Sequence, residues 1–512
     1  MNRRQFLFSA AAAPRAVQRP PNLLFIMTDQ QRFDALSCAG NSALPTPNLD
    51  RLAQEGVRFE NSMCPFPVCV PSRTGMLTGK SSANTGVRGN VAAQDTVSDP
   101  GPSFDNLLHD RGYKSQYYGK WHAPYKMTRT YDNKVAAVNV PDLPNEHREF
   151  LAYLDRHVPR RAPRKGELIE NYYDRRPYRP YPVDSEYQNA QTGIVDGKHP
   201  TQQEVIGVLD VPKEHTHAAY AVDLAIRALE EMKDGPFSLT CSISPPHPPF
   251  LSVQPYADMF PPAKMPLPKN FSHDLRWSPY RLRAESMSHY HNADFVRQLT
   301  AVYHAMVREV DDHIGRLLKR LDALGLRQNT LVIFTADHGE MLGSHGLVSK
   351  MVFHEEAVHV PLLMRMPGVI KPGTVVKHPV SGLDLFSTIL DYLGVPAPAR
   401  DGDSLRPLIA GRGKAGADYR VAEWGTRNAP NYMVRTADWK LMMADAPESK
   451  GVDALFDLRN DPYETRNLLG DPADRARYTG RAKEMKDRLL AWLERVHSPA
   501  LEGVRARKLT LA

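Results

Sequence analysis

Two runs of apolar residues, each followed by an aspartate, constrain the fold more than any other feature of the chain. Residues 22–28 form the first run and lead directly to Asp29, and residues 331–335 form the second and lead to Asp337. Continuous apolar runs of this kind are typical of strands buried on both faces, as in parallel sheets. The runs therefore predict an α/β fold with a large, mostly parallel sheet, and ligands of such sheets gather at the carboxyl ends of the strands.

Further segments continue this alternation of helix and strand. Apolar residues recur at three- and four-residue steps through 294–324, which predicts a long helix directly before the second run. The other predicted elements are strands at 113–118 and 237–244 and helices at 46–53 and 103–110. Two segments, 156–184 and 255–280, are rich in proline and show no periodicity, so we expect them to be long surface insertions.

The chain has 512 residues, of which 42% are apolar, enough for a large core. A cluster of glycines at 398–417 marks a boundary, and strands at 432–435, 439–442 and 454–458 with a helix at 480–496 follow it. We therefore expect a signal segment at 1–19, a catalytic domain at 20–410 and a smaller α+β domain with an antiparallel sheet at 411–512.

The N-terminus carries a targeting pattern. Arg3 and Arg4 precede a short apolar, alanine-rich run, which resembles a twin-arginine export signal. An unstructured N-terminus is the plainer alternative. No run approaches the roughly 18 apolar residues of a membrane span. We expect an exported protein, located in a bacterial periplasm.

Charge and cysteine content exclude some classes of function. The net charge of +7 mildly favours anionic partners, although a solvated surface is the plainer explanation. The chain lacks a nucleic-acid-binding motif beside its basic residues, so nucleic acid is not an expected partner. Four cysteines are too few for a disulfide scaffold, and their spacing is not that of a zinc site.

One of these cysteines lies in an extended motif. Cys69-Val70-Pro71-Ser72-Arg73 is followed by Leu-Thr-Gly-Lys at 77–80, which resembles the maturation signature of the type I sulfatases. The resemblance covers roughly residues 20–496. It implies an alkaline phosphatase-like α/β/α sandwich and a maturation enzyme that reads Pro71 and Arg73 and converts Cys69 to formylglycine. The hydrated aldehyde is then the nucleophile.

The same resemblance implies a metal site. Asp29 and Gln30 after the first run, and Asp337 and His338 after the second, would bind one Ca²⁺ together with the modified residue 69. Hard divalent cations prefer oxygen ligands. Many sulfatases have two acidic residues where this chain has Asp29 and Gln30, so Gln30 lowers the charge of the site by one.

Further site residues follow from the resemblance. Lys120 and Lys350, with Arg73, would bind the sulfate group, and His122 would assist proton transfer at the nucleophile. His247 and Lys350 would stabilise or protonate the departing alkoxide. Cations aimed at the charge of a sulfate ester supply much of the rate gain in such reactions.

The sequence thus predicts a sulfatase that hydrolyses a sulfated small molecule or glycan to an alcohol and sulfate. One alternative is a phosphonate monoester or phosphodiester hydrolase of the same fold, and another is a non-catalytic carbohydrate-binding relative. The basic segment 156–179 is interpreted either as a contact for a sulfated glycan or as a solvated loop or oligomer contact. No prediction follows for the leaving alcohol or for the oligomeric state.

Overall fold

The computed structural model describes residues 19–90, 100–124, 127, 131, 146–169, 175–181, 205–412, 416–426, 430–443 and 452–509. The twin-arginine pair lies outside these residues, as does part of the predicted insertion 156–184, whereas the predicted insertion 255–280 is described in full. Among the described residues, every helix is too short or too polar to cross a membrane.

A seven-stranded sheet forms the centre of the molecule, in the order β12-β2-β11-β10-β1-β8-β4. Its strands are β1 (Asn22–Thr28), β2 (Val57–Phe59), β4 (Lys114–Gly119), β8 (Phe237–Ile243), β10 (Thr330–Ala336), β11 (Leu362–Arg365) and β12 (Thr374–Val376). Only β11 runs antiparallel to its neighbours in this sheet. The predicted mostly parallel sheet is confirmed, and β1 and β10 are neighbours within it.

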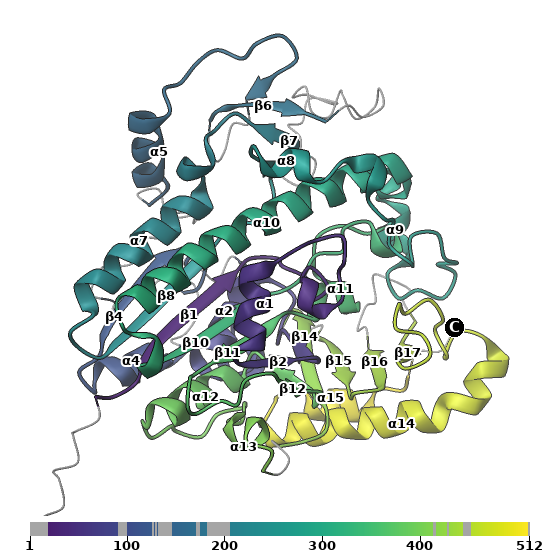
Figure 1. Ribbon diagram of the computed structural model, residues 1–512. Coiled ribbons are helices and arrows are strands. Elements are labelled where there is room, and N and C mark those ends of the chain that lie inside the picture. The colour runs from purple at the N-terminus through teal and green to yellow at the C-terminus, as the bar shows by residue number, and fades with distance from the viewer. Residues whose placement is uncertain are drawn as a thin grey trace, which may run out of the picture.

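Helices cover both faces of this sheet (Figure 1). Alternate residues of β1 explain the continuous apolar run, because Leu24 and Ile26 join the core on one face while Leu23, Phe25 and Met27 join the core on the other. The first face is covered by α1 (Pro47–Gln54), α7 (His217–Met232) and α10 (Ala293–Ala323). The second is covered by α2 (Cys69–Thr78), α4 (Phe104–His109) and α12 (Asp384–Leu393). The three-layer α/β/α arrangement is therefore as predicted.

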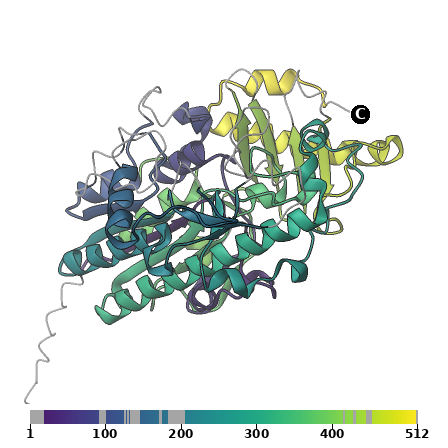
Figure 2. The same ribbon diagram turned by 90° about the horizontal axis from the view of Figure 1, so that it is seen from above.

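A second, antiparallel sheet follows near the C-terminus. Its strands, in spatial order, are β14 (Arg420–Gly425), β15 (Pro430–Arg435), β16 (Trp439–Met443) and β17 (Ala454–Asp457). One face packs against α14 (Pro472–Arg495) and α15 (Leu501–Ala506), and the other packs against the main body. Figure 2 shows this yellow and light-green part to one side of the main body. Helix α14 begins eight residues before the predicted start at 480, because Asp471 caps it and Pro472 fits its first turn.

Buried charges join the C-terminal sheet to the main body. Lys440 in β16 has no exposed surface, and its Nζ lies 2.6 Å from Glu355 and 2.7 Å from Glu464. His354 lies 3.1 Å from Glu464 through Nδ1, and its ring stacks on that of His345 at 3.7 Å between centroids. Burying such charges costs free energy unless every partner is present. The two parts are therefore held by a set of mutually dependent charges.

The described part of the predicted insertion 156–184 contains regular structure of its own. Helix α5 (Glu146–His157) leads into a sheet of order β5-β6-β7-β9, formed by β5 (Leu168–Ile169), β6 (Pro177–Pro180), β7 (Ile206–Leu209) and β9 (Phe250–Ser252). This sheet packs on α10, as Figure 1 shows above that helix. Several of its basic residues are paired within the protein: Arg160 with Asp155, Arg161 with Glu167 and Asp210, and buried Arg176 with Asp155.

Short strands and helices, besides several 3₁₀ turns, complete the described structure. They are β3 (Ser62–Met63), β13 (Val380–Ser381), α3 (Ser82–Thr85), α8 (Tyr256–Met259), α9 (Arg281–Glu285), α11 (Glu355–Val358) and α13 (Arg406–Ile409). The segment 255–280 contains only α8 and one 3₁₀ turn, in agreement with the predicted insertion.

Candidate active site

Cys69 is the first residue of α2, a helix whose ten residues are all buried. Its Sγ lies 3.2 Å from Nε2 of His338, and 4.0 Å from both Oδ1 of Asp29 and Nζ of Lys120. A helix N-terminus favours negative charge. Although burial and Asp29 act in the opposite direction, the positive charges of Lys120, Lys350 and His338 hold the pKa of the Cys69 thiol well below its usual value.

The two strand ends meet beside this cysteine. Thr28 is paired with Ala336 in the register of β1 and β10, so the residues that follow each strand are neighbours. Asp29, Asp337 and His338 are fully buried there, and with Cys69 they form a group whose ligand atoms all lie within 4.8 Å of one another. The sequence placed these four residues in one site, and the structure brings them together.

Arg73 lies behind the carboxylates. It has no exposed surface and pairs with Oδ2 of Asp337 at 2.7 Å and with Oδ2 of Asp29 at 2.9 Å. It also donates to the carbonyl oxygen of Lys120 at 2.7 Å and to Oγ of Ser242 at 2.9 Å. The sequence interpretation gave Arg73 a sulfate-binding role. In the structure its guanidinium is surrounded by protein acceptors and holds the Oδ2 atoms of both aspartates, which we interpret as a positioning role.

Gln30 is held in a left-handed backbone conformation, with φ of 69°. Its Nε2 donates to Glu340, and its Oε1 accepts from Nζ of Lys350 at 2.5 Å. Glu340 also accepts from the backbone of Leu342 and Ser349, so it is fixed in place. The amide oxygen of Gln30 is consequently oriented away from Glu340 and toward the lysine. Sequence reasoning missed the positioning role of Glu340, although the residue stands in the motif that follows Asp337.

Lys120 and His122 follow β4. Gly119, with φ of 93°, lies where a Cβ atom would be 1.8 Å from the carbonyl oxygen of Ser242, so only glycine lets the chain turn this close to β8. Lys120 pairs with Oδ2 of Asp29 at 2.7 Å. Burial and Lys120 lower the pKa of His122, against a hydrogen bond with Cys69 that raises it. His122 is therefore a neutral imidazole next to the nucleophile position.

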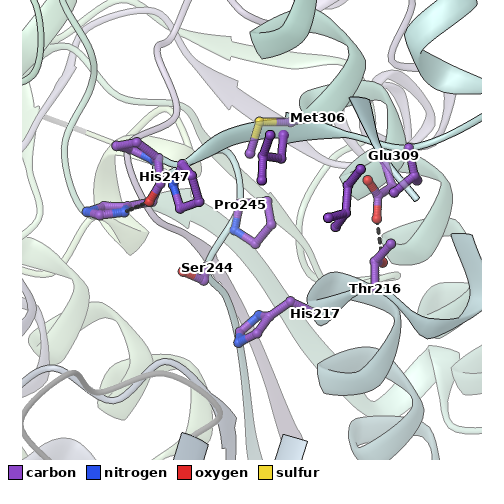
Figure 3. Close-up of a pocket in the computed structure, with 12 residues that line it drawn as sticks. Thr216, His217, Ser244, Pro245, His247, Met306 and Glu309 are labelled. Atoms are coloured by element: carbon purple, nitrogen blue, oxygen red, sulfur yellow. Dashed lines mark hydrogen bonds between the residues drawn. The ribbon is translucent and has the colours of Figure 1, made fainter. Parts of the chain in front are cut away.

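His247 follows β8 and faces the same cluster. Its Nδ1 lies 2.7 Å from the carbonyl oxygen of Pro248, and its Nε2 lies 4.0 Å from Oδ1 of Asp29. Burial, with Lys120 and Lys350, lowers the pKa of His247 to about 4, so the ring is neutral near pH 7. His247 is also one of the residues that line a cavity of about 60 Å³, and Figure 3 shows its ring pointing away from Thr216 and Glu309 on the other side of that cavity.

The two carboxylates titrate differently. Although burial raises it, the pKa of Asp29 is held well below its usual value by Lys120, His247 and Arg73. Burial and the charge of Asp29 raise the pKa of Asp337 to about 6. Two buried carboxylates this close to each other resist full ionisation, and a bound cation relieves that repulsion.

These donor groups fit a hard divalent cation. Two carboxylates and an amide oxygen are the ligand types that Ca²⁺ and Mg²⁺ prefer. His338 adds an imidazole whose Nδ1 lies 2.9 Å from the carbonyl oxygen of Gly339, which leaves Nε2 facing the cluster. Such a hydrogen bond is typical of metal-binding histidines. Asp29, Asp337 and His338 are therefore the residues that would hold a cation beside residue 69, and Gln30 adjoins them through its backbone N–H, which donates to Oδ1 of Asp337.

Comparison with known proteins gives a consistent result. The sulfatase family model matches residues 21–395, and a model of the C-terminal region of N-sulphoglucosamine sulphohydrolase matches residues 343–494. An N-acetylglucosamine-6-O-sulfatase of Bacteroides thetaiotaomicron is 27% identical, over 94% of this chain and 87% of its own length. An ulvan-active sulfatase of Formosa agariphila is 30% identical, over 88% of this chain and 78% of its own length.

Solved structures include a phosphonate monoester hydrolase of Agrobacterium radiobacter, which is 25% identical. It superimposes with a TM-score of 0.73 and covers 94% of this chain and 97% of its own.

Proposed function

The chain belongs to the sulfatase family of the alkaline phosphatase-like superfamily and is a sulfuric ester hydrolase, and on that premise we propose that it hydrolyses the sulfate ester of a carbohydrate at a formylglycine made from Cys69. The observation that carries the proposal is the position of Cys69. It begins a buried helix, and its Sγ lies within 4.0 Å of a metal-type donor cluster and of a lysine. A residue buried among these charges is placed for chemistry rather than for packing.

The modification and the cation have separate tasks. Formylglycine, when hydrated, supplies a hydroxyl nucleophile and a second hydroxyl whose deprotonation lets sulfate leave. A divalent cation held by Asp29, Asp337 and His338, which we propose to be Ca²⁺, would act as a Lewis acid toward the nucleophile and the ester. Arg73 keeps the carboxylates of Asp29 and Asp337 oriented for this cation through their Oδ2 atoms.

Two lysines supply positive charge for the sulfate group. Lys120 reaches the cluster from the end of β4, and Lys350 reaches it from the loop that follows β10. The surrounding negative charges of Cys69 and Asp29 raise the pKa of Lys350 despite its burial, so it stays protonated. Positive groups fixed in a buried site bind developing negative charge strongly, because they need no reorganisation.

The proton transfers divide between the histidines and Lys350. His122 is neutral and hydrogen-bonded to Cys69, so it is suited to accept a proton from residue 69. His247, with a pKa of about 4, carries no proton on Nε2 to give at pH 7 in the free site. Lys350 is therefore the better donor to the departing alkoxide, and His247 is suited to accept a hydrogen bond from the substrate.

The substrate class rests on the relatives and on the surface of the protein. Two relatives are named for activity on N-acetylglucosamine-6-sulfate and on ulvan, and both of these substrates are carbohydrates. The added sheet of β5, β6, β7 and β9 also exposes Arg164, Lys165, Arg175 and Arg179. β9 begins three residues after His247, which connects this surface to the site. A sulfated saccharide is therefore the substrate class that we propose.

The test uses protein co-expressed with a formylglycine-generating enzyme. We expect the peptide that contains residue 69 to have the mass of formylglycine, and sulfate to be released from N-acetylglucosamine-6-sulfate or from ulvan oligosaccharides. The Cys69→Ala variant is the matched control and should release none. A thiol mass in fully active protein would contradict the nucleophile, and turnover of 4-nitrophenyl sulfate without turnover of any sulfated sugar would contradict the substrate class.

The second candidate is a phosphonate monoester hydrolase, which the structural similarity at a TM-score of 0.73 favours. The same preparation should be compared on an aryl sulfate and on an aryl phosphonate monoester. The sulfatase proposal expects the higher kcat/KM on the sulfate, and a higher value on the phosphonate would reverse the assignment.

We also propose export to the periplasm, which rests on the twin-arginine pattern at Arg3 and Arg4. The protein should be found in the periplasmic fraction of its host, and replacement of both arginines by lysine should retain it in the cytoplasm. Equal export of the variant would rule out this route.

A further inference from the structure

The encoded cysteine changes which metal the site prefers. Before any modification, the cluster offers sulfur from Cys69, nitrogen from His338 and oxygens from Asp29 and Asp337, all from buried residues. The Sγ and Nε2 atoms are 3.2 Å apart, and Oδ1 of Asp29 is 3.9 Å from Nε2 and 4.0 Å from Sγ. Separations of this size let one small ion contact all of these atoms.

The chemistry of this set differs from that of the mature enzyme. Thiolate, imidazole and carboxylate are the ligands of Zn²⁺, which prefers a tetrahedral set. Ca²⁺ prefers about six to eight oxygen ligands and gains little from sulfur. Conversion of Cys69 to formylglycine removes the sulfur and puts oxygen in its place, so the same cluster changes from a thiophilic to an oxygen-rich site.

The surrounding residues already orient the four donor atoms. Arg73 takes Oδ2 of both aspartates, while Oδ1 of Asp29 lies 4.0 Å from Sγ of Cys69 and Oδ1 of Asp337 lies 3.7 Å from Nε2 of His338. The hydrogen bond between Nδ1 of His338 and Gly339 directs Nε2 into the cluster. Because Gln30 is an amide and not a carboxylate, the unmodified site has one charged oxygen ligand fewer to offer Ca²⁺.

We propose that the unmodified chain binds Zn²⁺ through Cys69, His338, Asp29 and Asp337, and that conversion of Cys69 changes the preference of this site to Ca²⁺. The statement about the converted form rests on the proposed function, whereas zinc binding by the cysteine form does not. Zinc bonds to the thiolate sulfur, and a protonated thiol releases its proton to solvent as it binds. Zinc bound in this way also keeps the thiolate from reacting.

The test uses full-length protein produced without a maturation enzyme, with the thiol confirmed by mass. Co²⁺ is the spectroscopic probe, because a cobalt–thiolate bond gives a charge-transfer band in the near ultraviolet that ligation by histidine or carboxylate alone does not give. We expect this band in the parent protein, and we expect Zn²⁺ to displace Co²⁺ and remove it. Binding constants for Zn²⁺ and Ca²⁺ are measured by titration on the same samples.

Two serine variants separate the site from other thiols. Cys69→Ser should lose the band and weaken zinc binding by more than the roughly 10–100-fold that loss of an outer hydrogen-bond partner costs. Cys38→Ser removes a half-buried thiol outside the cluster, so this variant should keep both the charge-transfer band and the zinc affinity of the parent. Circular dichroism should be the same for all three proteins, which shows that they are folded.

The outcomes are decisive in both directions. A band that persists in Cys69→Ser, or a parent protein that binds Ca²⁺ more tightly than Zn²⁺, overturns the proposal. A converted protein that still prefers Zn²⁺ overturns its second half. Because the sulfatase assay uses converted protein, an inactive enzyme would leave the zinc result standing, and absence of zinc binding would leave the sulfatase result standing.

Discussion

Replacement of Arg73 by methionine tests whether this residue holds the two aspartates in place. Methionine has a similar length but no charge, so the variant removes ion pairs of 2.7 Å and 2.9 Å that have no exposed surface. Removing one partner of a buried pair typically costs about 3–5 kcal/mol, because the other charge stays buried. Lys120 still pairs with Asp29 at 2.7 Å, so Asp337 carries most of the uncompensated charge. We therefore expect the free energy of unfolding to fall by about 3 kcal/mol, and not by twice that amount.

The measurement is the free energy of unfolding in urea, followed by circular dichroism on unmodified protein with EDTA at pH 7.5. Use of unmodified protein matters, because the resemblance to the type I sulfatases implies that Arg73 is also read by the maturation enzyme. The loss should shrink below pH 6, since the pKa of Asp337 is already raised to about 6 and the protonated acid needs no counter-ion.

The matched control is Arg160→Met, which breaks the pair with Asp155 at a site where the arginine side chain is 54% exposed. Exposed pairs contribute little, so this variant should unfold at the same urea concentration as the parent. If Arg73→Met is no less stable than this control, the two carboxylates do not depend on the arginine and the reasoning is refuted.

Three further predictions concern the site and its surroundings. Glu340→Gln removes the carboxylate that orients the amide of Gln30, and we expect kcat/KM to fall by about 10–100-fold with a higher Ca²⁺ requirement; an unchanged requirement would contradict this role. Burial lowers the pKa of His304 to about 4, so protons favour the unfolded chain as the pH falls from about 6.5 to 4. When the pH falls from 7 to 5, the free energy of unfolding of His304→Gln should therefore decrease by about 2 kcal/mol less than that of the parent. Equal decreases would show that the pKa of His304 is not lowered in the folded protein. EDTA should abolish hydrolysis of sulfate esters and Ca²⁺ should restore it, whereas full turnover of metal-free protein would exclude a catalytic cation.

The central sheet was predictable because its strands are buried on both faces. β1 and β10 read as unbroken apolar runs for that reason, and α10 read as a helix because its apolar residues recur at three- and four-residue steps. The sequence could not show that β11 lies antiparallel beside β10, since that arrangement depends on packing between distant segments.

The added sheet was not predictable from periodicity. β5 has two residues, and β6 is Pro-Tyr-Arg-Pro, so neither is long enough to show an alternating pattern. Their stability comes from packing on α10, which local sequence does not encode. The first turns of α14 were missed for a related reason, because they are polar and mostly exposed.

The site was predictable where a motif marked it and not where partners are distant. Cys69, Asp29 and Asp337 lie in recognisable motifs and meet as expected. The ion pairs of Arg73 join residues far apart in the chain, so its positioning role appears only in the fold. The low pKa of His247 likewise results from burial near two lysines, and it changes which residue is suited to protonate the leaving group.

The buried charges around Lys440 limit how this protein can be recombined with its relatives. One carboxylate partner, Glu355, belongs to the main body, and the other, Glu464, lies after the last strand of the C-terminal sheet. A chimaera with a crossover between Glu355 and Glu464 would separate Lys440 from one of its two carboxylate partners and leave a buried charge short of a counter-ion. Libraries that exchange C-terminal parts among sulfatases should therefore keep these three positions as one heritable unit, or replace all of them together.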